Sequence, residues 1–194
     1  MRSGVKIGGQ PGELPTVLID SLFHEGHKIV KDRKLGIFDK RRAESLIRMQ
    51  EEMSEKTSVP CMLDIVAEDP GTLIKYIDFV SEVTNAPFLI NDQKMSVRIS
   101  AADHTVEVGL QERTVYNSIN YTLNEEEINA IKETGLKAAI IQAFNPRNPR
   151  PEGMISILIG SDEKEDLLEG AYRAGIEKLL IHTSVRCSKC WFSG

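Results

Sequence analysis

The sequence is poor in the features that define several common classes of protein. It has only three cysteines in 194 residues, too few for a disulfide framework. No apolar run approaches the roughly 20 residues that a membrane-spanning helix needs, which argues against an integral membrane protein. The first nine residues also hold no apolar stretch typical of a signal peptide. We therefore expect a cytoplasmic protein.

Positive charge is not in excess either. The 24 Lys and Arg residues face 29 Asp and Glu residues, which gives a formal net charge of −5. A surface that follows nucleic-acid phosphates needs clustered basic side chains. The basic stretch 40–42 lies beside Asp39 and Glu44 and is typical of a solvated helix face. The sequence therefore predicts no nucleic-acid partner.

What is present is a repeated alternation of short apolar runs and amphipathic stretches. The apolar runs lie at 15–23, 61–67, 87–90, 114–119, 136–144 and 178–185. Helices are predicted between them, from Asp39 to about Thr57, from about Pro70, over about 96–110, from Asn124 to Gly135, and from Asp162 to Gly175. The apolar stripe predicted on the first helix consists of Ala43, Leu46, Ile47, Met49 and Met53. This alternation predicts an α/β fold with a parallel sheet covered by helices.

Two α/β architectures fit the pattern: a doubly wound open sheet and a TIM (β/α)8-type barrel. No Gly-x-Gly-x-x-Gly or phosphate loop follows a strand, so a nucleotide-binding open sheet loses its main support. Polar residues end the predicted strands, as they do at the active-site mouth of a barrel, and we favour the barrel. The chain supplies about six strand–helix units where a barrel has eight. We expect an incomplete barrel over 1–185, either a fragment or one whose open edge another subunit covers.

Three amide side chains end successive predicted strands: Asn91, Asn117 and Gln142. Amides pair a donor with an acceptor, which suits the edge of a flat heterocycle that bears amide and amine groups. For each residue taken singly, the alternative is that the amide only caps a loop. The sequence therefore indicates a heterocycle site, with both interpretations open.

Other polar motifs carry less chemistry. His24 and His27 flank Glu25 in a loop, but no third ligand follows at convincing spacing, so we predict no metal site. The Gly- and Pro-rich segment 6–15 is typical of a turn that leads into the first strand. Cys187 and Cys190 form a lone Cys-x-x-Cys, which we interpret as an incidental part of a C-terminal tail over 186–194.

Six stretches are informative in combination. They are KIGGQPGE at 6–13, FHEGHK at 23–28, QEEMS at 50–54, VTNAPF at 83–88, VGL at 108–110 and YNSIN at 116–120. Together they resemble the family formed by the H subunit of tetrahydromethanopterin S-methyltransferase and its bacterial relatives, the methylcorrinoid:tetrahydrofolate methyltransferases. The resemblance runs from about Val5 to Val185 and excludes the tail.

The resemblance implies a pterin-binding barrel and a reaction of one-carbon metabolism. A methyl group would move between N5 of a reduced pterin, tetrahydrofolate or tetrahydromethanopterin, and the cobalt of a corrinoid (cobalamin) on a partner protein. It further implies a homodimer and, in methanogen-type systems, peripheral association with a membrane methyltransferase complex. The alternative function is a truncated family member, weakly active or inactive, that keeps only protein–protein contacts.

The resemblance also implies site residues. Family members hold the pterin with an acid that ends the third strand, an Asn that ends the fourth and an acid that ends the sixth. Asn117 matches the second of these, whereas Asn91, followed by Asp92, and His182 replace the two acids. Asn91, Asn117 and His182 are the predicted pterin-binding residues. No catalytic residue is assigned, but Asn120 and Gln142 are candidates for a polar network near N5.

Overall fold

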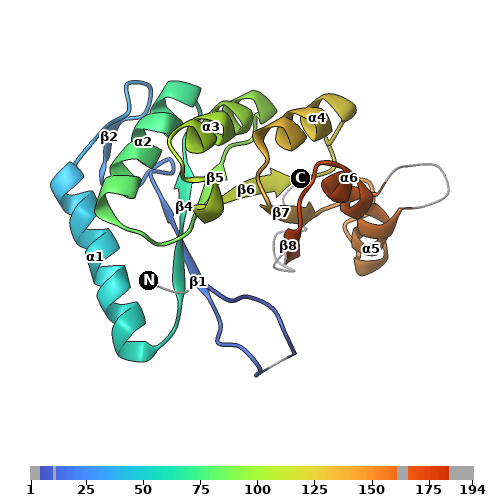
Figure 1. Cartoon of the computed structure of the whole chain (residues 1–194), viewed down its shortest axis with the longest axis horizontal. Helices are drawn as coiled ribbons and strands as arrows, with labels where there is room; N and C mark the ends of the chain where they lie inside the picture. The colour runs from blue at the N-terminus through green and yellow to red at the C-terminus, as the bar shows by residue number, and fades with distance from the viewer. Residues whose placement is uncertain (1–4, 11, 161–165, 184–194) are drawn as a thin grey trace, which may run out of the picture. The chain divides into compact units, whose positions relative to one another are not determined.

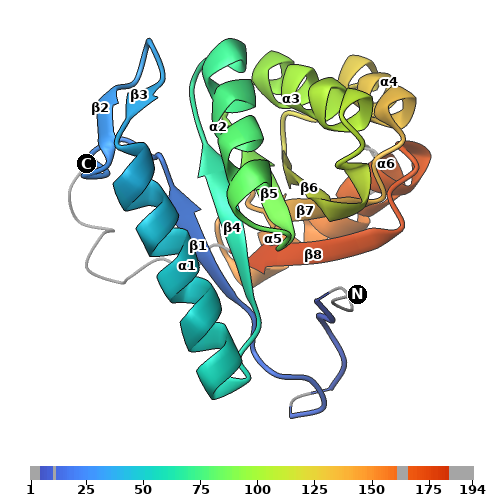
Figure 2. The ribbon, with the colours of Figure 1, turned by 60° about the vertical axis from the view of Figure 1, so that its left-hand side comes forward.

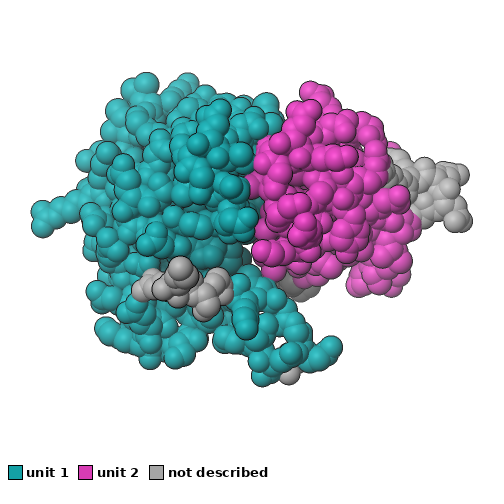
Figure 3. Space-filling model, viewed as in Figure 1, with its two compact units in different colours: residues 1–117 teal, residues 118–194 magenta. Residues whose placement is uncertain are grey.

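The computed structural model describes residues 5–10, 12–160 and 166–183 (Figure 1). The chain divides into two compact units, residues 1–117 and 118–194 (Figure 3). We call them unit 1 and unit 2 and describe each by itself. The predicted tail at 186–194, with Cys187 and Cys190, lies outside the described residues.

Strands and helices alternate along both units (Figure 1). Unit 1 contains β1 (Leu18–Leu22), β2 (Val30–Asp32), β3 (Ile37–Phe38), α1 (Lys40–Thr57), β4 (Cys61–Val66), α2 (Pro70–Val83), β5 (Phe88–Asn91), α3 (Met95–Glu107) and the 3-10 helix η1 (Gln111–Arg113). The strand β6 (Thr114–Ile119) follows, and after it come α4 (Glu125–Thr134), β7 (Ala138–Ala143), α5 (Pro151–Ile159), α6 (Leu167–Arg173) and β8 (Lys178–Thr183). No helix among the described residues is both long enough and apolar enough to cross a membrane.

The strand order decides between the two predicted architectures. The main sheet has the order β1-β4-β5-β6-β7-β8, and the strand pairs of units 1 and 2 are parallel. A doubly wound sheet reverses its order at a switch point, but this order follows the sequence throughout. The fold is therefore an incomplete TIM-type (β/α) barrel with six strands, as predicted.

Local signals determine where the helices of unit 1 begin. Oδ1 of Asp39 accepts a hydrogen bond from the Arg42 backbone N–H at 3.1 Å and caps α1. Asp69 caps α2 in the same way through Thr72, at 3.0 Å, and Pro70 occupies the first turn. Figure 2 shows α1 and α2 lying alongside β4.

Unit 2 follows similar rules. Asn124 caps α4, three acids fill its first turn, and Gly135 ends it in the left-handed conformation with φ 70°. Asp166 caps α6 through the Glu169 backbone N–H. The helix predicted to begin at Asp162 thus begins at Leu167, while Asp162 itself lies outside the described residues.

The stripe predicted on α1 was too wide. Only Ala43 and Ile47 are buried, while Met49 and Met53 are 57% and 51% exposed. At about 100° per residue, Met53 lies roughly 80° and Met49 roughly 120° round the helix from Ala43. The helix therefore packs through a narrow face that excludes both methionines.

Some short elements were not predicted. The loop expected between the first strand and α1 contains an antiparallel hairpin of β2 and β3. The nine-residue helix α5 lies within a stretch for which no helix was expected. Conversely, the helix predicted over about 96–110 ends at Glu107, and η1 follows it.

Candidate functional site

A buried carboxylate forms the centre of a polar cluster in unit 1. Asp64 lies inside β4 and is only 6% exposed. Its Oδ2 accepts hydrogen bonds from Asn91 Nδ2 at 2.9 Å and from Ser21 Oγ at 3.0 Å. Its Oδ1 accepts one from Asn117 Nδ2 at 3.0 Å. We call Ser21, Asp64, Asn91 and Asn117 the Asp64 cluster.

Strand register brings the Asp64 cluster together. Ser21 is the register partner of Asp64, and Asn91 is the register partner of Asn117. Asn91 itself pairs with Val66, two residues beyond Asp64, so Asp64 and Asn91 lie on the same face of the sheet. Four neighbouring parallel strands, β1, β4, β5 and β6, thus each place one polar side chain on that face.

The carboxylate fixes the orientation of both amides. Because Asn91 and Asn117 each donate through Nδ2 to an acceptor-only group, their side-chain oxygens are turned away from Asp64. No residue in the described part of the chain donates to either oxygen. Both side chains are only half-buried. The Asp64 cluster therefore presents two adjacent acceptors that suit the donor edge of a heterocycle.

Asp64 was missed at the sequence level. It lies in the middle of the apolar run 61–67, whereas the predicted site residues all lie near the ends of strands. The available signal was a single carboxylate between apolar residues of a buried strand, where an unpaired charge is costly.

Asp92, the acid next to Asn91, does not join the cluster. Its Oδ1 accepts a hydrogen bond from the Lys94 backbone N–H at 2.7 Å and shapes the turn before α3. The amide of Asn91 thus lies at the end of β5, while the neighbouring Asp92 stabilises the turn that follows.

A buried cation lies behind the two amides. Arg98 of α3 is 1% exposed and donates to the backbone oxygens of Asp92 at 2.6 Å and Gln93 at 3.0 Å. Its guanidinium carbon lies 5.1 Å from the ring centroid of Tyr116. Arg98 therefore contacts the residue after Asn91 and the residue before Asn117.

Unit 2 places the other predicted residues. Gln142 of β7 and His182 of β8 are register partners, so they lie side by side on one face. Gln142 is half-buried and His182 is exposed. Asn120 follows β6, and its Oδ1 accepts hydrogen bonds from the backbone N–H and the hydroxyl of Thr122, at 2.9 and 2.7 Å. The oxygen of Asn120 thus serves a turn.

The two histidines after β1 form a compact turn. The rings of His24 and His27 meet edge to face, 5.1 Å apart. Burial, followed by the charge of His24, lowers the pKa of His27 below the ordinary value of 6.5. No group of three or more His, Cys, Asp or Glu side chains suited to a metal ion occurs among the described residues.

Comparison with known proteins identifies the class. The model of the family described as "Tetrahydromethanopterin S-methyltransferase MtrH subunit" matches residues 2–188. The chain belongs to this family, which confirms the resemblance seen in the sequence.

Curated relatives agree with this assignment. The chain is 47% identical over 184 residues to the H subunit of tetrahydromethanopterin S-methyltransferase from Methanopyrus kandleri, covering 93% of the chain and 57% of the relative. It is 45% identical over 186 residues to the protein of that name in Methanothermobacter thermautotrophicus, covering 94% and 60%. It is 42% identical over 185 residues to the H subunit of the putative methyltransferase mtx from Methanosarcina barkeri, again covering 94% and 60%. The chain thus spans 57–60% of the length of these relatives.

Proposed function

We propose that the chain binds a reduced pterin and takes part in methyl transfer between its N5 and the cobalt of a corrinoid carried on a partner protein. The observation that carries the proposal is the Asp64 cluster, in which one buried carboxylate sets two amides side by side. Membership of the MtrH family and the printed names of the relatives favour tetrahydromethanopterin over tetrahydrofolate as the pterin.

In this proposal Asn91 and Asn117 accept hydrogen bonds from the N–H and the exocyclic amine of the pterin. Neutral hydrogen bonds contribute about 0.5–1.5 kcal/mol each, against about 1.5–3 kcal/mol for bonds to a charged group. Asp64 supplies its charge indirectly, since its hydrogen bonds polarise the amides and keep their oxygens available. The hydrogen bonds from the pterin to the two amides are therefore weaker than bonds to two carboxylates would be, but the amides are well oriented to accept them.

Methyl transfer from N5 requires a proton at that nitrogen so that a neutral amine leaves, and a polar side chain can help to deliver it. Asn120 and Gln142 are the proposed candidates for this network, and His182 is proposed as a further pterin contact. Of these two amides, Gln142 is the one whose side chain forms no hydrogen bond with another described residue. The corrinoid, when bound through its own protein, supplies the cobalt that gives or accepts the methyl group.

Protein partners are part of the proposal. The relatives are named as subunits, which favours assembly with other chains. Peripheral association with a membrane methyltransferase complex is a further part of the proposal. In the described sheet order β1 and β8 are the terminal strands, and Leu18, Ile19 and Ile181 on them are 59%, 43% and 52% exposed. Exposed apolar edge strands promote association, so we propose a homodimer as well.

The test uses methylcob(III)alamin with either tetrahydromethanopterin or tetrahydrofolate. We expect the purified chain to cause loss of the cobalt–carbon absorbance with at least one pterin. No change with either pterin would rule out an active methyltransferase. If the chain then still bound a corrinoid protein but neither pterin, the alternative function, a family member that keeps only protein contacts, would replace the proposal.

A further inference from the structure

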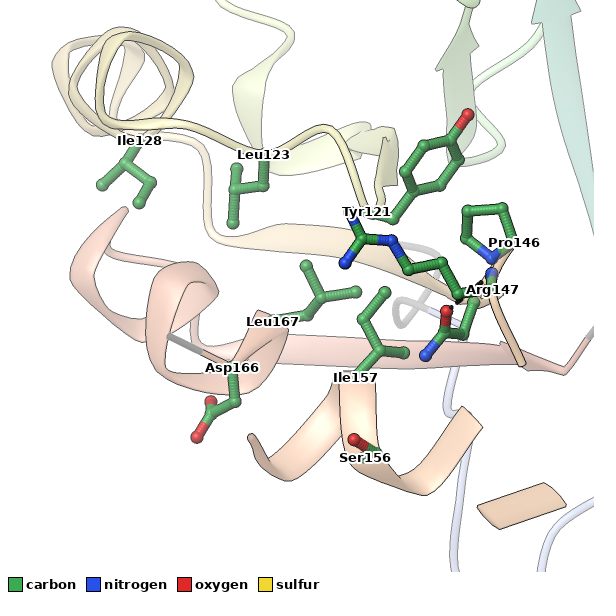
Figure 4. A pocket seen from close by; sticks show the side chains of 10 residues that line it. Tyr121, Leu123, Ile128, Pro146, Arg147, Ser156, Ile157, Asp166 and Leu167 are labelled. Atoms are coloured by element: carbon green, nitrogen blue, oxygen red, sulfur yellow. Dashed lines mark hydrogen bonds between the residues drawn. The ribbon is translucent and has the colours of Figure 1, made fainter. Parts of the chain in front are cut away.

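The described residues that line one cavity all belong to unit 2 (Figure 4). Its volume is about 530 Å³, which falls within the range of small-molecule sites. The lining comes from the loop after β6, the loop after β7 and the helices α4, α5 and α6. Its described lining includes five apolar residues: Leu123, Ile128, Pro146, Ile157 and Leu167.

One cationic side chain, that of Arg147, lines the cavity together with these apolar residues. Among the described residues that line the cavity, Arg147 is the one with a positive charge. Among the described residues no carboxylate forms an ion pair with it. Asp166, which also lines the cavity, uses its Oδ1 to cap α6 by accepting a hydrogen bond from the Glu169 backbone N–H. Figure 4 shows the Arg147 side chain extending from the loop after β7 toward Leu123.

The loop that carries Arg147 is fixed by its own hydrogen bonds. Oδ1 of Asn145 accepts from the backbone N–H groups of Arg147 at 3.0 Å and Asn148 at 3.3 Å. Nδ2 of Asn145 donates to the Gly153 backbone oxygen at 3.3 Å, which holds the loop against the start of α5. A loop that is ordered before binding lowers the entropic cost of holding a ligand.

We propose that this cavity binds a small organic anion, a carboxylate or phosphate attached to an aryl or branched alkyl body. The anionic group pairs with the Arg147 guanidinium, whose fork geometry suits both acids. The apolar body packs against Leu123, Ile157 and Leu167. The inference rests on unit 2 alone and does not depend on the pterin or on the Asp64 cluster.

The test is a titration of the full chain with phenyl phosphate, followed by NMR of isotope-labelled Ile and Leu methyl groups. We expect saturable shifts at Leu123, Ile128, Ile157 and Leu167. Arg147→Gln should weaken binding about tenfold or more, whereas Arg147→Lys should keep part of the affinity. Arg150→Gln, in the same loop but outside the lining, is the matched control and should change binding less than about twofold.

Benzyl alcohol, which has an aryl body but no anionic group, measures the contribution of the apolar body alone. It should bind more weakly than phenyl phosphate, and its binding should not respond to Arg147→Gln. The proposal is overturned if the shifts localise elsewhere, if none occur up to about 10 mM phenyl phosphate, or if Arg147→Gln binds it as tightly as the parent. Unchanged methyl spectra of the free variants establish that each one is folded.

Discussion

At the scale of single residues, Asp64 breaks the pattern of its strand. Its neighbours Leu63 and Ile65 are 2% and 0% exposed, and an apolar residue would continue that core. The chain instead buries a carboxylate and gives it three hydrogen bonds. A buried charge contributes little net stability even when it is well paired. Such a departure from the local pattern is typical of a position that serves binding.

Replacing the carboxylate by an amide tests this role. In Asp64→Asn one of the partner amides must face another N–H group, so we expect the free energy of unfolding to fall by about 1–3 kcal/mol. Urea unfolding measures the change. Asp20→Asn, at an exposed site on β1, is the matched control and should stay within about 0.5 kcal/mol. Equal losses in the two variants would contradict a specific role for Asp64.

His27 predicts a pH dependence of stability. Its pKa in the folded protein lies below the ordinary 6.5, mainly because burial opposes the charged form. Between the lowered pKa and 6.5 the unfolded chain therefore binds more protons than the folded one. Stability should then fall as the pH drops below about 6.5. His27→Gln should flatten this slope in urea unfolding at a series of pH values, and an unchanged slope would disprove the assignment.

At the scale of elements, the family-like stretch 83–88 supports the fold at the amino end of β5. Thr84 Oγ1 donates to Glu51 Oε1 at 2.6 Å. Arg113 donates to the backbone oxygens of Thr84 at 2.6 Å and Ala86 at 3.0 Å. Asn91, by contrast, lies at the carboxyl end of the same strand. The stretch 83–88 thus supports the strands, whereas the proposed pterin contact Asn91 lies at the opposite end of β5, where barrels carry their binding sites.

Helix α5 depends on a glycine. A Cβ at Gly153 would lie 2.0 Å from the Asn148 backbone oxygen, so Gly153→Ala should displace the loop against α5 and destabilise unit 2 by more than about 1 kcal/mol. Gly71→Ala, near the start of α2, is the control: its Cβ meets only Asp69 Oδ1, at 3.4 Å. That variant should be neutral or stabilised by up to about 1 kcal/mol. Thermal unfolding of both variants checks the contrast, and a shared direction of change would contradict it.

Strong local signals made much of the fold predictable. The run 114–119 coincides with β6, and Asp39 and Asn124 cap their helices as predicted. The hairpin of β2 and β3 was missed because strands of three and two residues show no alternation. Helix α5 was missed because its nine residues are apolar on most faces and show no helical period.

At the scale of the whole molecule, the candidate site depends on register between strands far apart in the sequence. The hydrogen bond from Asn117 to Asp64 joins residues 53 positions apart. A single sequence shows that amides end several strands, but it cannot show which of them meet one buried acid. The four residues of the Asp64 cluster all lie within residues 1–117. The pterin contacts proposed for Asn91 and Asn117 can therefore be tested with this chain, although it spans 57–60% of the length of its relatives.

The most direct measurement is a calorimetric titration of the chain with tetrahydromethanopterin, compared across three proteins. The parent should bind, and Asn117→Ala should lose about tenfold or more in affinity, because it removes an acceptor and leaves Asp64 short of a donor. Asn85→Ala, an exposed position before β5, should bind like the parent. If the parent does not bind, or if Asn117→Ala binds as tightly as Asn85→Ala, the Asp64 cluster is not the pterin site.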